Sequence, residues 1–414
     1  EVTLGHHGVI SNDNQTVVLW VQVPRLVSIT EEDTRDNLIG LLYWRGTVYD
    51  TYTNGQWLRS REAGTETVLD ETMTRDNGKI WFARSPEGPT DARRSLDERQ
   101  LNDWDEQEIN VVGLSHPVAF ALDEPMAFRV RPPPPGALTT LGMDRRFGGE
   151  VGMKLEYASG RGGTATLTDF AGARYFAYSR TPTGRVPFGR GRAIAELQAE
   201  RRLSNYLVVP RSLSPRVSAL ARQITEGKAL PMAKALAVIE WLQKSHEYTT
   251  DLKRDPSIPD PLEDFLFTQK AGHCEYFASA AAILLRLSGI PTRYVNGFLG
   301  GEWNDLSKYL TVRDNRAHSW VEAYLGPAGW VRIDATPSAG RGSHMGRIRQ
   351  LFDSVEFFWS RWVIDYDVSR QVDIARRIGR SVGVGGASFD LRQAKRVMRW
   401  GLAALGAGGL IAML

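Results

Sequence analysis

The sequence has almost no cysteine, since Cys274 is the only one in 414 residues. A lone cysteine excludes an internal disulfide framework, and it supplies too few thiolates for a zinc ribbon or an iron–sulfur cluster. Three interpretations remain for it: an inert thiol in the core, one ligand of a mixed metal site, or a nucleophile. The composition, with 42% hydrophobic and 24% charged residues, excludes wholesale disorder and is sufficient for two or three folded domains.

The chain also lacks a strong excess of one charge, because 51 basic and 48 acidic residues leave a net charge of +3. The excess is confined to residues 341–400, where 12 basic residues outnumber 6 acidic ones. These basic residues are mostly interleaved with acidic residues at helical spacing, which is not the pattern of a nucleic-acid-binding surface. We therefore expect no nucleic-acid partner.

Long apolar runs are scarce as well. Residues 400–414 form a charge-free run that as a helix covers about 22 Å, short of the ~30 Å of a bilayer core. Because the run ends only where the chain ends, we expect it to be the start of a transmembrane helix. The alternatives are an apolar C-terminal tail and a buried helix. Residues 341–399 place apolar side chains, including Trp359 and Trp362, on one helical face. This pattern predicts a helix packed on the protein body or an interfacial helix beside a membrane.

Residues 1–192 have the pattern of many short β-strands. Asn54-Gly55 and Asn77-Gly78 have the composition of hairpin turns. Short strands with regular turns predict a sandwich-like region or an open barrel. Alternating, β-branched or aromatic segments recur at 15–23, 40–52, 66–73, 79–85, 118–130 and 152–159.

The periodicity changes near residue 193. Apolar residues at spacings of three and four predict helices at 193–207, 214–227 and 230–249, and Ser214 before Pro215 is a plausible N-cap. Strand patterns return at 290–336. The fold class is therefore α+β, with a β-rich region at 1–192, a core at 193–340, a helical segment at 341–399 and the start of a membrane helix at 400–414.

The segment GHCEYFASAAAILLRLSGIP, residues 272–291, places the cysteine at the beginning of a helix. Gly272 precedes Cys274, an Ala-rich amphipathic pattern follows, and Gly289 and Pro291 end the helix. Backbone N–H groups and the positive end of the helix dipole stabilise a thiolate in the first turn. This position is compatible with a nucleophile, with an inert thiol and with a metal ligand.

His318 and Asp334 follow Cys274 in an order that suits a catalytic triad. A thiolate nucleophile needs a base, and the base needs a carboxylate that fixes its orientation. His318 begins a predicted strand and Asp334 ends the next one. With a plain four-residue loop the two would point to opposite faces of the sheet. A triad therefore requires an odd loop or a bulge, which places Asp334 opposite Trp320 or Glu322.

Other chemistry around these residues is also conceivable. Trp320 lies two residues after His318 on the same strand face, where it either lines a substrate cleft or packs in the core. His273 is expected to make a local hydrogen bond or packing contact. A zinc site built from Cys274, His318 and Asp334 is chemically permissible. The triad order and the helix-start position favour the nucleophile, so we expect no metal and no other cofactor.

Four blocks of sequence together resemble the transglutaminase-like superfamily of cysteine enzymes. They are GHCEYFA, LRLSGIPTRYVNGF, AHSWVEAYL and GWVRIDATP, between residues 272 and 337. The segment LLYWRGTVYDTYTNGQW at 41–57 resembles the region before the core in bacterial membrane-anchored members of the TgpA type. The joint occurrence of these blocks in this order is specific, whereas any one of them alone would be weak.

The resemblance implies a transglutaminase-like (papain-like) core in which Cys274 is the nucleophile, His318 the base and Asp334 the orienting carboxylate. It implies a protein of the bacterial inner membrane whose catalytic domain lies in the periplasm or another extracytoplasmic space. The expected activity is acyl transfer through a thioester, from a glutamine carboxamide to an amine, on proteins or peptides of the cell envelope. Two alternatives stay open: a cysteine protease or amidase with the same triad, and a non-catalytic envelope scaffold or binding module.

Overall fold

The computed structural model of the chain describes residues that all fall between Val2 and Pro337. Several sequence predictions lie outside them: the strand at 66–73, the turn at Asn77-Gly78, the segment 341–399 and the apolar run 400–414. The described residues are 2–4, 15–59, 75–76, 79–83, 104–112, 118–122, 124–130, 155–157, 165–167, 174–180, 203–252, 260–326 and 329–337.

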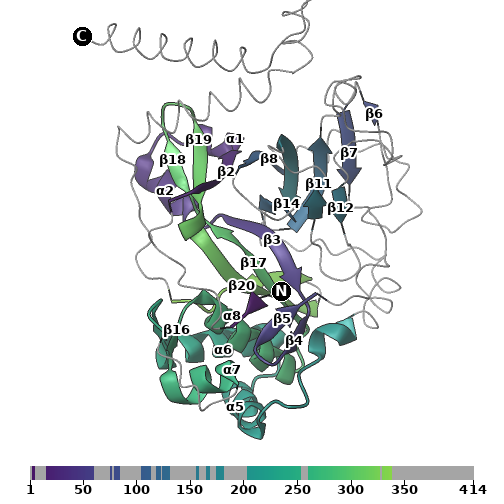
Figure 1. Cartoon of the computed structure of the whole chain (residues 1–414), viewed down its shortest axis with the longest axis vertical. Helices are drawn as coiled ribbons and strands as arrows, with labels where there is room; N and C mark the ends of the chain where they lie inside the picture. Colours follow the sequence, from purple (N-terminus) through teal and green to yellow (C-terminus); the bar gives the residue numbers. More distant parts are fainter. Residues whose placement is uncertain are drawn as a thin grey trace, which may run out of the picture. The chain divides into compact units, whose positions relative to one another are not determined.

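The described elements mix strands and helices, which confirms the α+β fold class (Figure 1). The strands are β1 Val2–Thr3, β2 Val17–Gln22, β3 Tyr43–Tyr49, β4 Thr51–Thr53, β5 Gln56–Leu58, β6 Arg75–Asp76, β7 Lys79–Ala83, β8 Asp105–Val111, β9 Val118–Ala119, β10 Ala121–Leu122, β11 Glu124–Val130, β12 Leu155–Tyr157, β13 Ala165–Leu167, β14 Arg174–Arg180, β15 Glu247–Tyr248, β16 Ala271–Gly272, β17 Thr292–Leu299, β18 Glu302–Asn304, β19 Tyr309–Arg313, β20 Ala317–Tyr324 and β21 Trp330–Ile333. The α-helices are α1 Pro24–Val27, α2 Glu32–Ile39, α5 Pro215–Thr225, α6 Pro231–Ser245, α7 Pro261–Asp264 and α8 Cys274–Leu287, joined by the 3₁₀ turns η2 Ser204–Leu207 and η4 Asp314–Arg316 and the π-helical turn η3 Phe265–Gln269.

Local predictions and structure agree at two signals. Asn54 and Gly55 both have positive φ, 47° and 79°, and connect β4 to β5 in a two-residue hairpin. The side chain of Ser214 caps α5 by accepting a hydrogen bond from the N–H of Arg216. Periodicity did not predict α1 and α2, which are short helices inside the region expected to be mostly β, nor strands β8, β13 and β14.

Two larger sheets each combine strands from both sides of residue 192. The five-stranded sheet has the order β10-β3-β17-β20-β21. The eight-stranded sheet has the order β18-β19-β2-β8-β14-β11-β7-β6. In the first sheet β3 lies beside β17, and in the second β2 lies beside β19, with antiparallel pairing in both cases. A domain boundary at residue 192 would therefore divide the strands of both sheets between two domains. The boundary stays a prediction.

Strands β3 and β17 lie very close together within the five-stranded sheet, next to the core that this sheet shares with the eight-stranded one. Apolar side chains of both sheets share one core, and the indole of Trp44 donates a 2.7 Å hydrogen bond to the carbonyl of Gly300. A Cβ at Gly297 would stand 2.0 Å from the carbonyl oxygen of Trp44. Glycine is therefore required at this position, where the register between β17 and β3 also shifts.

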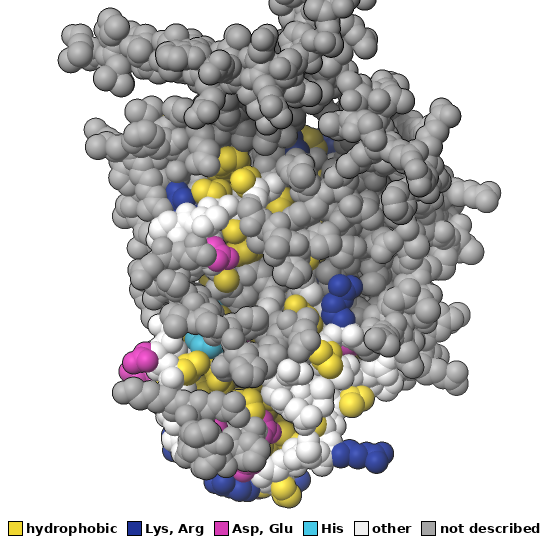
Figure 2. Space-filling model, in the orientation of Figure 1, with side chains coloured by type: hydrophobic (Ala, Val, Ile, Leu, Met, Phe, Trp, Pro, Cys, Tyr) yellow, Lys and Arg dark blue, Asp and Glu magenta, His cyan; other side chains and the backbone are white. Residues whose placement is uncertain are grey.

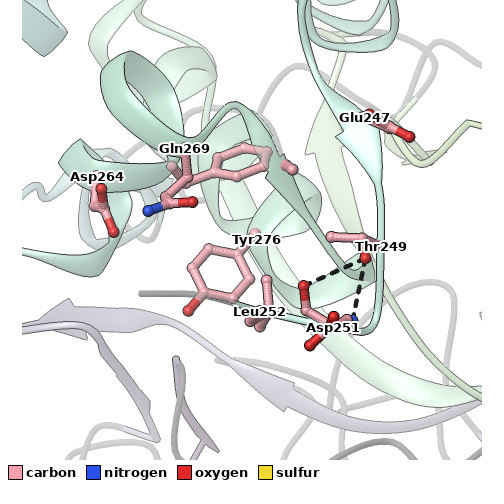
Figure 3. Close-up of a pocket in the computed structure, with 9 residues that line it drawn as sticks. Glu247, Thr249, Asp251, Leu252, Asp264, Gln269 and Tyr276 are labelled. Carbon is pink, nitrogen blue, oxygen red and sulfur yellow. Dashed lines mark hydrogen bonds between the residues drawn. The ribbon is translucent and has the colours of Figure 1, made fainter. Parts of the chain in front are cut away.

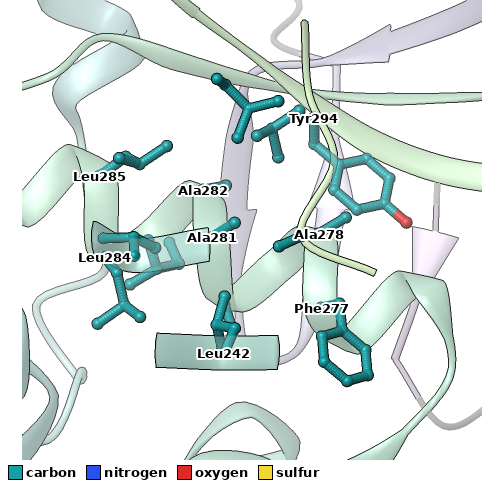
Figure 4. Packing of buried hydrophobic residues seen from close by; sticks show 14 of the residues in the cluster. Leu242, Phe277, Ala278, Ala281, Ala282, Leu284, Leu285 and Tyr294 are labelled. Carbon is teal, nitrogen blue, oxygen red and sulfur yellow. The ribbon is translucent and has the colours of Figure 1, made fainter. Parts of the chain in front are cut away.

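Helix α8 is the centre of the second core. Every residue from Cys274 to Arg286 is buried, as expected for a helix that is apolar nearly all round. One side of α8 packs on β17 and β20, and the other packs on α5 and α6. Figure 4 shows its small residues, among them Ala281 and Ala282, between Leu242 of α6 and Tyr294 of β17. This packing fixes the position of the beginning of α8, where the cysteine lies.

Among the described residues, no helix combines the length and apolar character that a membrane crossing needs. On the face in Figure 2, the coloured basic and acidic side chains lie among hydrophobic and neutral ones. The described part of this face therefore carries both charge signs in mixture.

Candidate active site

The segment before α8 is held in a fixed path toward the cysteine. Lys270 adopts the left-handed conformation, with φ of 51°, and ends the π-helical turn η3. The following strand β16 pairs in parallel with β15. The N–H of Glu247 donates to the carbonyl of Lys270 at 2.8 Å, and the N–H of Thr249 donates to that of Gly272 at 2.9 Å. A Cβ at Gly272 would lie 3.0 Å from the Cβ of Tyr276, so this position has little room for a side chain.

Cys274 is the first residue of α8, as the sequence predicted, and it is the only cysteine in the chain. His273 is the N-cap, in an extended conformation, and its Nδ1 accepts a 3.4 Å hydrogen bond from the N–H of Glu275. The side chains of His273 and His318 both hydrogen-bond the thiol. The cysteine therefore has an imidazole from its own helix start and a second one from β20.

The register of β20 and β21 is the one that a triad requires. Val321 pairs with Ile333 and Tyr324 with Trp330, so the loop between the strands is odd and Asp334 falls opposite Trp320. His318 and Asp334 then share one face of the sheet. The Nε2 of His318 lies 2.8 Å from Oδ2 of Asp334. The regular four-residue register that would have separated these two residues is absent from this hairpin.

Asp334 receives two further hydrogen bonds. The hydroxyl of Tyr43, on β3, donates to Oδ2 at 2.7 Å, the same oxygen that faces His318. The N–H of Thr336 donates to Oδ1 at 2.9 Å. Tyr43 carries no signal in the sequence, because nothing local distinguishes it from other aromatic residues of a strand.

The charges of the three residues support one another. Burial favours the neutral thiol of Cys274, but hydrogen bonds from His273 and His318 and their charges lower its pKa to about 5. Burial disfavours a charged His318, but the charge and hydrogen bond of Asp334, together with Cys274, raise its pKa to about 9. Burial opposes the charge of Asp334, yet His318, Tyr43 and Thr336 hold its pKa well below the usual range. Near neutral pH the site holds a thiolate, an imidazolium and a carboxylate.

Trp320 packs against the imidazole ring of His318. Its side chain is 1% exposed and packs with Val48 and Val295. Its ring stacks on His318 with centroids 6.2 Å apart and meets Tyr43 edge-on at 5.1 Å. Of the two roles expected for Trp320, this placement matches the packing role. A contact with substrate stays a prediction.

Glu275 is a buried carboxyl directly after the nucleophile. Its Oε2 has no hydrogen-bond partner and lies 4.0 Å from Nδ1 of His273. Burial raises the pKa of Glu275 to about 7, with the charge of Cys274 adding to the effect and that of His273 opposing it. The charge of this carboxyl also contributes to raising the pKa of the phenols of Tyr49 and Tyr294. Nothing in the sequence alone marks Glu275 as part of the electrostatics of the site.

The arrangement of Cys274, His318 and Asp334 is a relay through one imidazole. Asp334 occupies Nε2 of His318, which leaves Nδ1 for the thiol. Three metal ligands would instead converge on a common point. Within the described part of the chain, no three His, Cys, Asp or Glu side chains are grouped to hold a metal ion.

A pocket of about 270 Å³ lies beside the beginning of α8 (Figure 3). In Figure 3, Tyr276 lies between Asp264 and Asp251. The ring of Tyr276 meets that of His273 edge-on at 5.1 Å, which links the pocket to the N-cap. The nine lining residues include three carboxylates and no Lys or Arg, so they favour a cationic over an anionic group; they are Glu247, Thr249, Asp251, Leu252, Asp264, Phe265, Gln269, Ala271 and Tyr276.

Comparison with known proteins identifies the core. Residues 218–335 match the family described as the transglutaminase-like superfamily. Over 196 residues the chain is 31% identical to protein-glutamine gamma-glutamyltransferase of Pseudomonas aeruginosa, an alignment that covers 40% of this chain and 29% of that protein. Over 137 residues it is 37% identical to the uncharacterized protein YebA of Bacillus subtilis, covering 32% of this chain and 19% of that protein. The chain thus spans less than a third of the length of either relative.

The fold also has a solved counterpart. The periplasmic domain of TgpA from Pseudomonas aeruginosa superposes with a TM-score of 0.51 at 20% identity, covering 78% of this chain and 91% of that one. At this identity the likeness establishes the fold alone. The resemblance seen in the sequence is confirmed: the chain contains a transglutaminase-like core, and the proteins it is similar to include those of the TgpA type.

Proposed function

We propose that the chain is the extracytoplasmic catalytic part of a bacterial membrane-anchored enzyme that transfers the acyl group of a glutamine carboxamide to an amine. The observation that carries the proposal is the contact of His318 with both the Cys274 thiol and, at 2.8 Å, Oδ2 of Asp334. A thiolate paired with an imidazolium is the activated form of a cysteine nucleophile. The Pseudomonas aeruginosa relative is a protein-glutamine gamma-glutamyltransferase by name, which supports glutamine as the acyl donor.

The first half of the reaction forms a thioester. The Cys274 thiolate attacks the carboxamide carbon, and the negative charge moves to the carbonyl oxygen. The N–H of Cys274, at the positive end of α8, is the expected donor to that oxygen. His318 gives its proton to the nitrogen, the C–N bond breaks, and ammonia leaves.

The second half transfers the acyl group. An amine attacks the thioester carbon and gives a proton to the now neutral His318, the C–S bond breaks, and the thiolate is restored. The acidic lining of the pocket beside α8 suits a basic amine, which binds as the cation and loses one proton to solvent before it attacks, better than an anionic acceptor. Water in place of the amine would make the enzyme an amidase or protease with the same triad.

The test is the incubation of the purified chain with a labelled primary amine and a glutaminyl protein. Incorporation of label that is abolished in Cys274→Ala supports acyl transfer. Release of ammonia or of peptide without incorporation would replace the proposal with hydrolysis. Neither product, in a folded protein, would leave only the non-catalytic scaffold. The Cys274→Ala protein also serves to show that any label bound by wild type is covalent and enzymatic.

The proposed location has its own test. The membrane-anchored arrangement and the envelope substrates rest on the sequence resemblance and on the fold shared with a periplasmic domain. Protease added to intact spheroplasts expressing the whole protein should digest the region of residues 15–337 when it lies outside the cytoplasm. Protection until the membrane is lysed would contradict the location.

A further inference from the structure

Tyr43 belongs to the part of the chain that precedes the transglutaminase-like match, yet its hydroxyl reaches the triad. It lies on β3, which pairs with β17 in the five-stranded sheet. Its hydroxyl donates a 2.7 Å hydrogen bond to Oδ2 of Asp334, a residue 291 positions later in the chain. The family match begins only at residue 218. The contact is therefore supplied to the core by the N-terminal region.

Two donors meet on one oxygen of the carboxylate. Oδ2 accepts from the Tyr43 hydroxyl at 2.7 Å and faces Nε2 of His318 at 2.8 Å. Oδ1 accepts from the N–H of Thr336. A carboxylate oxygen has two lone-pair sites, so both donors on Oδ2 can be satisfied at once. Oδ2 of Asp334, the oxygen that orients His318, is therefore shared between His318 and Tyr43.

The ring of Tyr43 is fixed from three sides. It meets Trp320 edge-on at 5.1 Å and lies 5.9 Å from the ring of His318. The guanidinium of Arg332, on β21, lies 4.0 Å over its face. A cation at that distance stabilises electron density in the ring and makes the phenol a better donor. The hydroxyl therefore has a defined direction, and loss of the hydroxyl alone need not move the ring.

We propose that Tyr43 is a positioning residue of the catalytic site, whose hydroxyl holds Oδ2 of Asp334 in place and takes a share of its charge, so that the His318 imidazolium remains a good acid for the leaving group. The inference rests on the proposed triad and on no particular acyl donor. It predicts a specific defect: a His318 that binds its proton too tightly. Such a defect slows only the step in which the leaving nitrogen must be protonated.

Other charged and titratable groups lie around Tyr43, Asp334 and His318. Cys274 of α8 faces His318, and Asp334 follows β21. Arg332 faces the Tyr43 ring. His273 and Glu275 act on the thiol from the beginning of α8. None of these groups is altered when the Tyr43 hydroxyl is removed, so a change in the pH profile is attributable to the Asp334–His318 pair.

The experiment compares Tyr43→Phe with a matched control. Tyr178→Phe removes a phenol that also donates at 2.7 Å to a carboxylate, Oε2 of Glu106, in the eight-stranded sheet. Alkylation of Cys274 by iodoacetamide is followed against pH, together with turnover of a glutaminyl peptide and of an activated aryl ester. The ester's leaving group departs without a proton, so it does not need the acidity of His318. Thermal unfolding confirms that each variant is folded.

For Tyr43→Phe we expect the upper inflection of the alkylation profile, near pH 9 in wild type, to move up by about one pH unit. Turnover of the glutaminyl peptide should fall about fivefold in kcat with KM unchanged, while the ester rate stays within about twofold. Tyr178→Phe should behave as wild type. An unchanged inflection, a downward shift, or an equal loss on both substrates would overturn the inference. Failure of the proposed function is visible separately, as wild-type Cys274 no more reactive than free cysteine.

Discussion

Arg286, at the end of α8, donates a 2.7 Å hydrogen bond from Nη2 to the carbonyl oxygen of Asp50, which follows β3. The same buried guanidinium donates to the carbonyls of Thr292 and Val208. It also lies over the ring of Trp57 with its Cζ 5.1 Å from the centroid. One side chain thus fastens the nucleophile helix to the N-terminal region, to β17 and to the segment before α5.

Arg286→Met should destabilise the fold strongly. The substitution leaves buried carbonyls without donors, and we expect a loss of about 3 kcal/mol in the free energy of unfolding. Urea unfolding at pH 7 measures it. Arg222→Met, on the exposed side of α5, is the control and should change stability by less than about 0.5 kcal/mol. A loss as small as that of the control would show that Arg286 is not needed for this junction.

Asp334→Asn should lower the pKa of His318. Burial opposes the charged imidazole, and the charge of Asp334 is the main influence that raises its pKa to about 9. Wild-type alkylation of Cys274 should rise through about pH 5 and change again near pH 9. In Asp334→Asn the upper inflection should fall by at least about one pH unit. An inflection that stays near 9 would mean that His318 does not depend on this carboxylate.

Glu275→Gln should stabilise the protein at alkaline pH. Burial raises the pKa of Glu275 from 4.5 to about 7 in the folded state. A raised pKa means that the folded state is favoured below about pH 4.5 and loses that advantage as pH rises through 7. Relative to wild type, the variant should therefore gain up to about 3 kcal/mol at pH 8 and little at pH 5. Urea unfolding at both values, with exposed Glu226→Gln as control, measures the gain. An equal effect at the two pH values would exclude a titrating Glu275 as its cause.

Glu322→Gln should be destabilising in the opposite pH range. Glu322 is buried between Arg45, whose Nε lies 2.8 Å from Oε1, and Arg293. Burial opposes its charge, but the two arginines lower its pKa to about 2. A lowered pKa stabilises the folded state above the unfolded value near 4.5, and the stability is lost as pH falls toward 2. We expect a loss of about 3 kcal/mol at pH 7 that shrinks by pH 3. A loss that is independent of pH would contradict this account.

The grouping of Cys274, His318 and Asp334 could be anticipated from the sequence because each residue has a local signal; their catalytic roles stay a prediction. Cys274 stands between a glycine and an Ala-rich helix, and the hairpin after His318 has a length that decides the face of Asp334. Tyr43 has no such signal: an aromatic residue in a strand predicts packing, and its partner is known only when the sheet order is known. Helices α1 and α2 were missed because α1 has only four residues and α2 is mostly polar, so tertiary contacts rather than periodicity determine them.

His273 shows a second limit of local reasoning. A hydrogen bond near the helix start was expected of it, and it accepts one from the N–H of Glu275. Its contact with the thiol was not expected, because adjacent helical side chains point in different directions. His273 is extended rather than helical, with ψ of −177°. The rule for helix neighbours therefore does not apply to it, and its ring can reach the cysteine.

The pairing of β3 with β17 also governs the order in which the chain can fold. Tyr49 pairs with Tyr294, 245 positions later. Synthesis proceeds at about 5–20 residues per second, so β17 is made roughly 12 to 50 s after β3. Until then its edge is open to wrong partners. Contacts this distant in sequence make folding slow. We expect a cell to need a chaperone, or delayed release of the chain, to keep β3 from wrong pairing until the nucleophile helix and β17 have been synthesised.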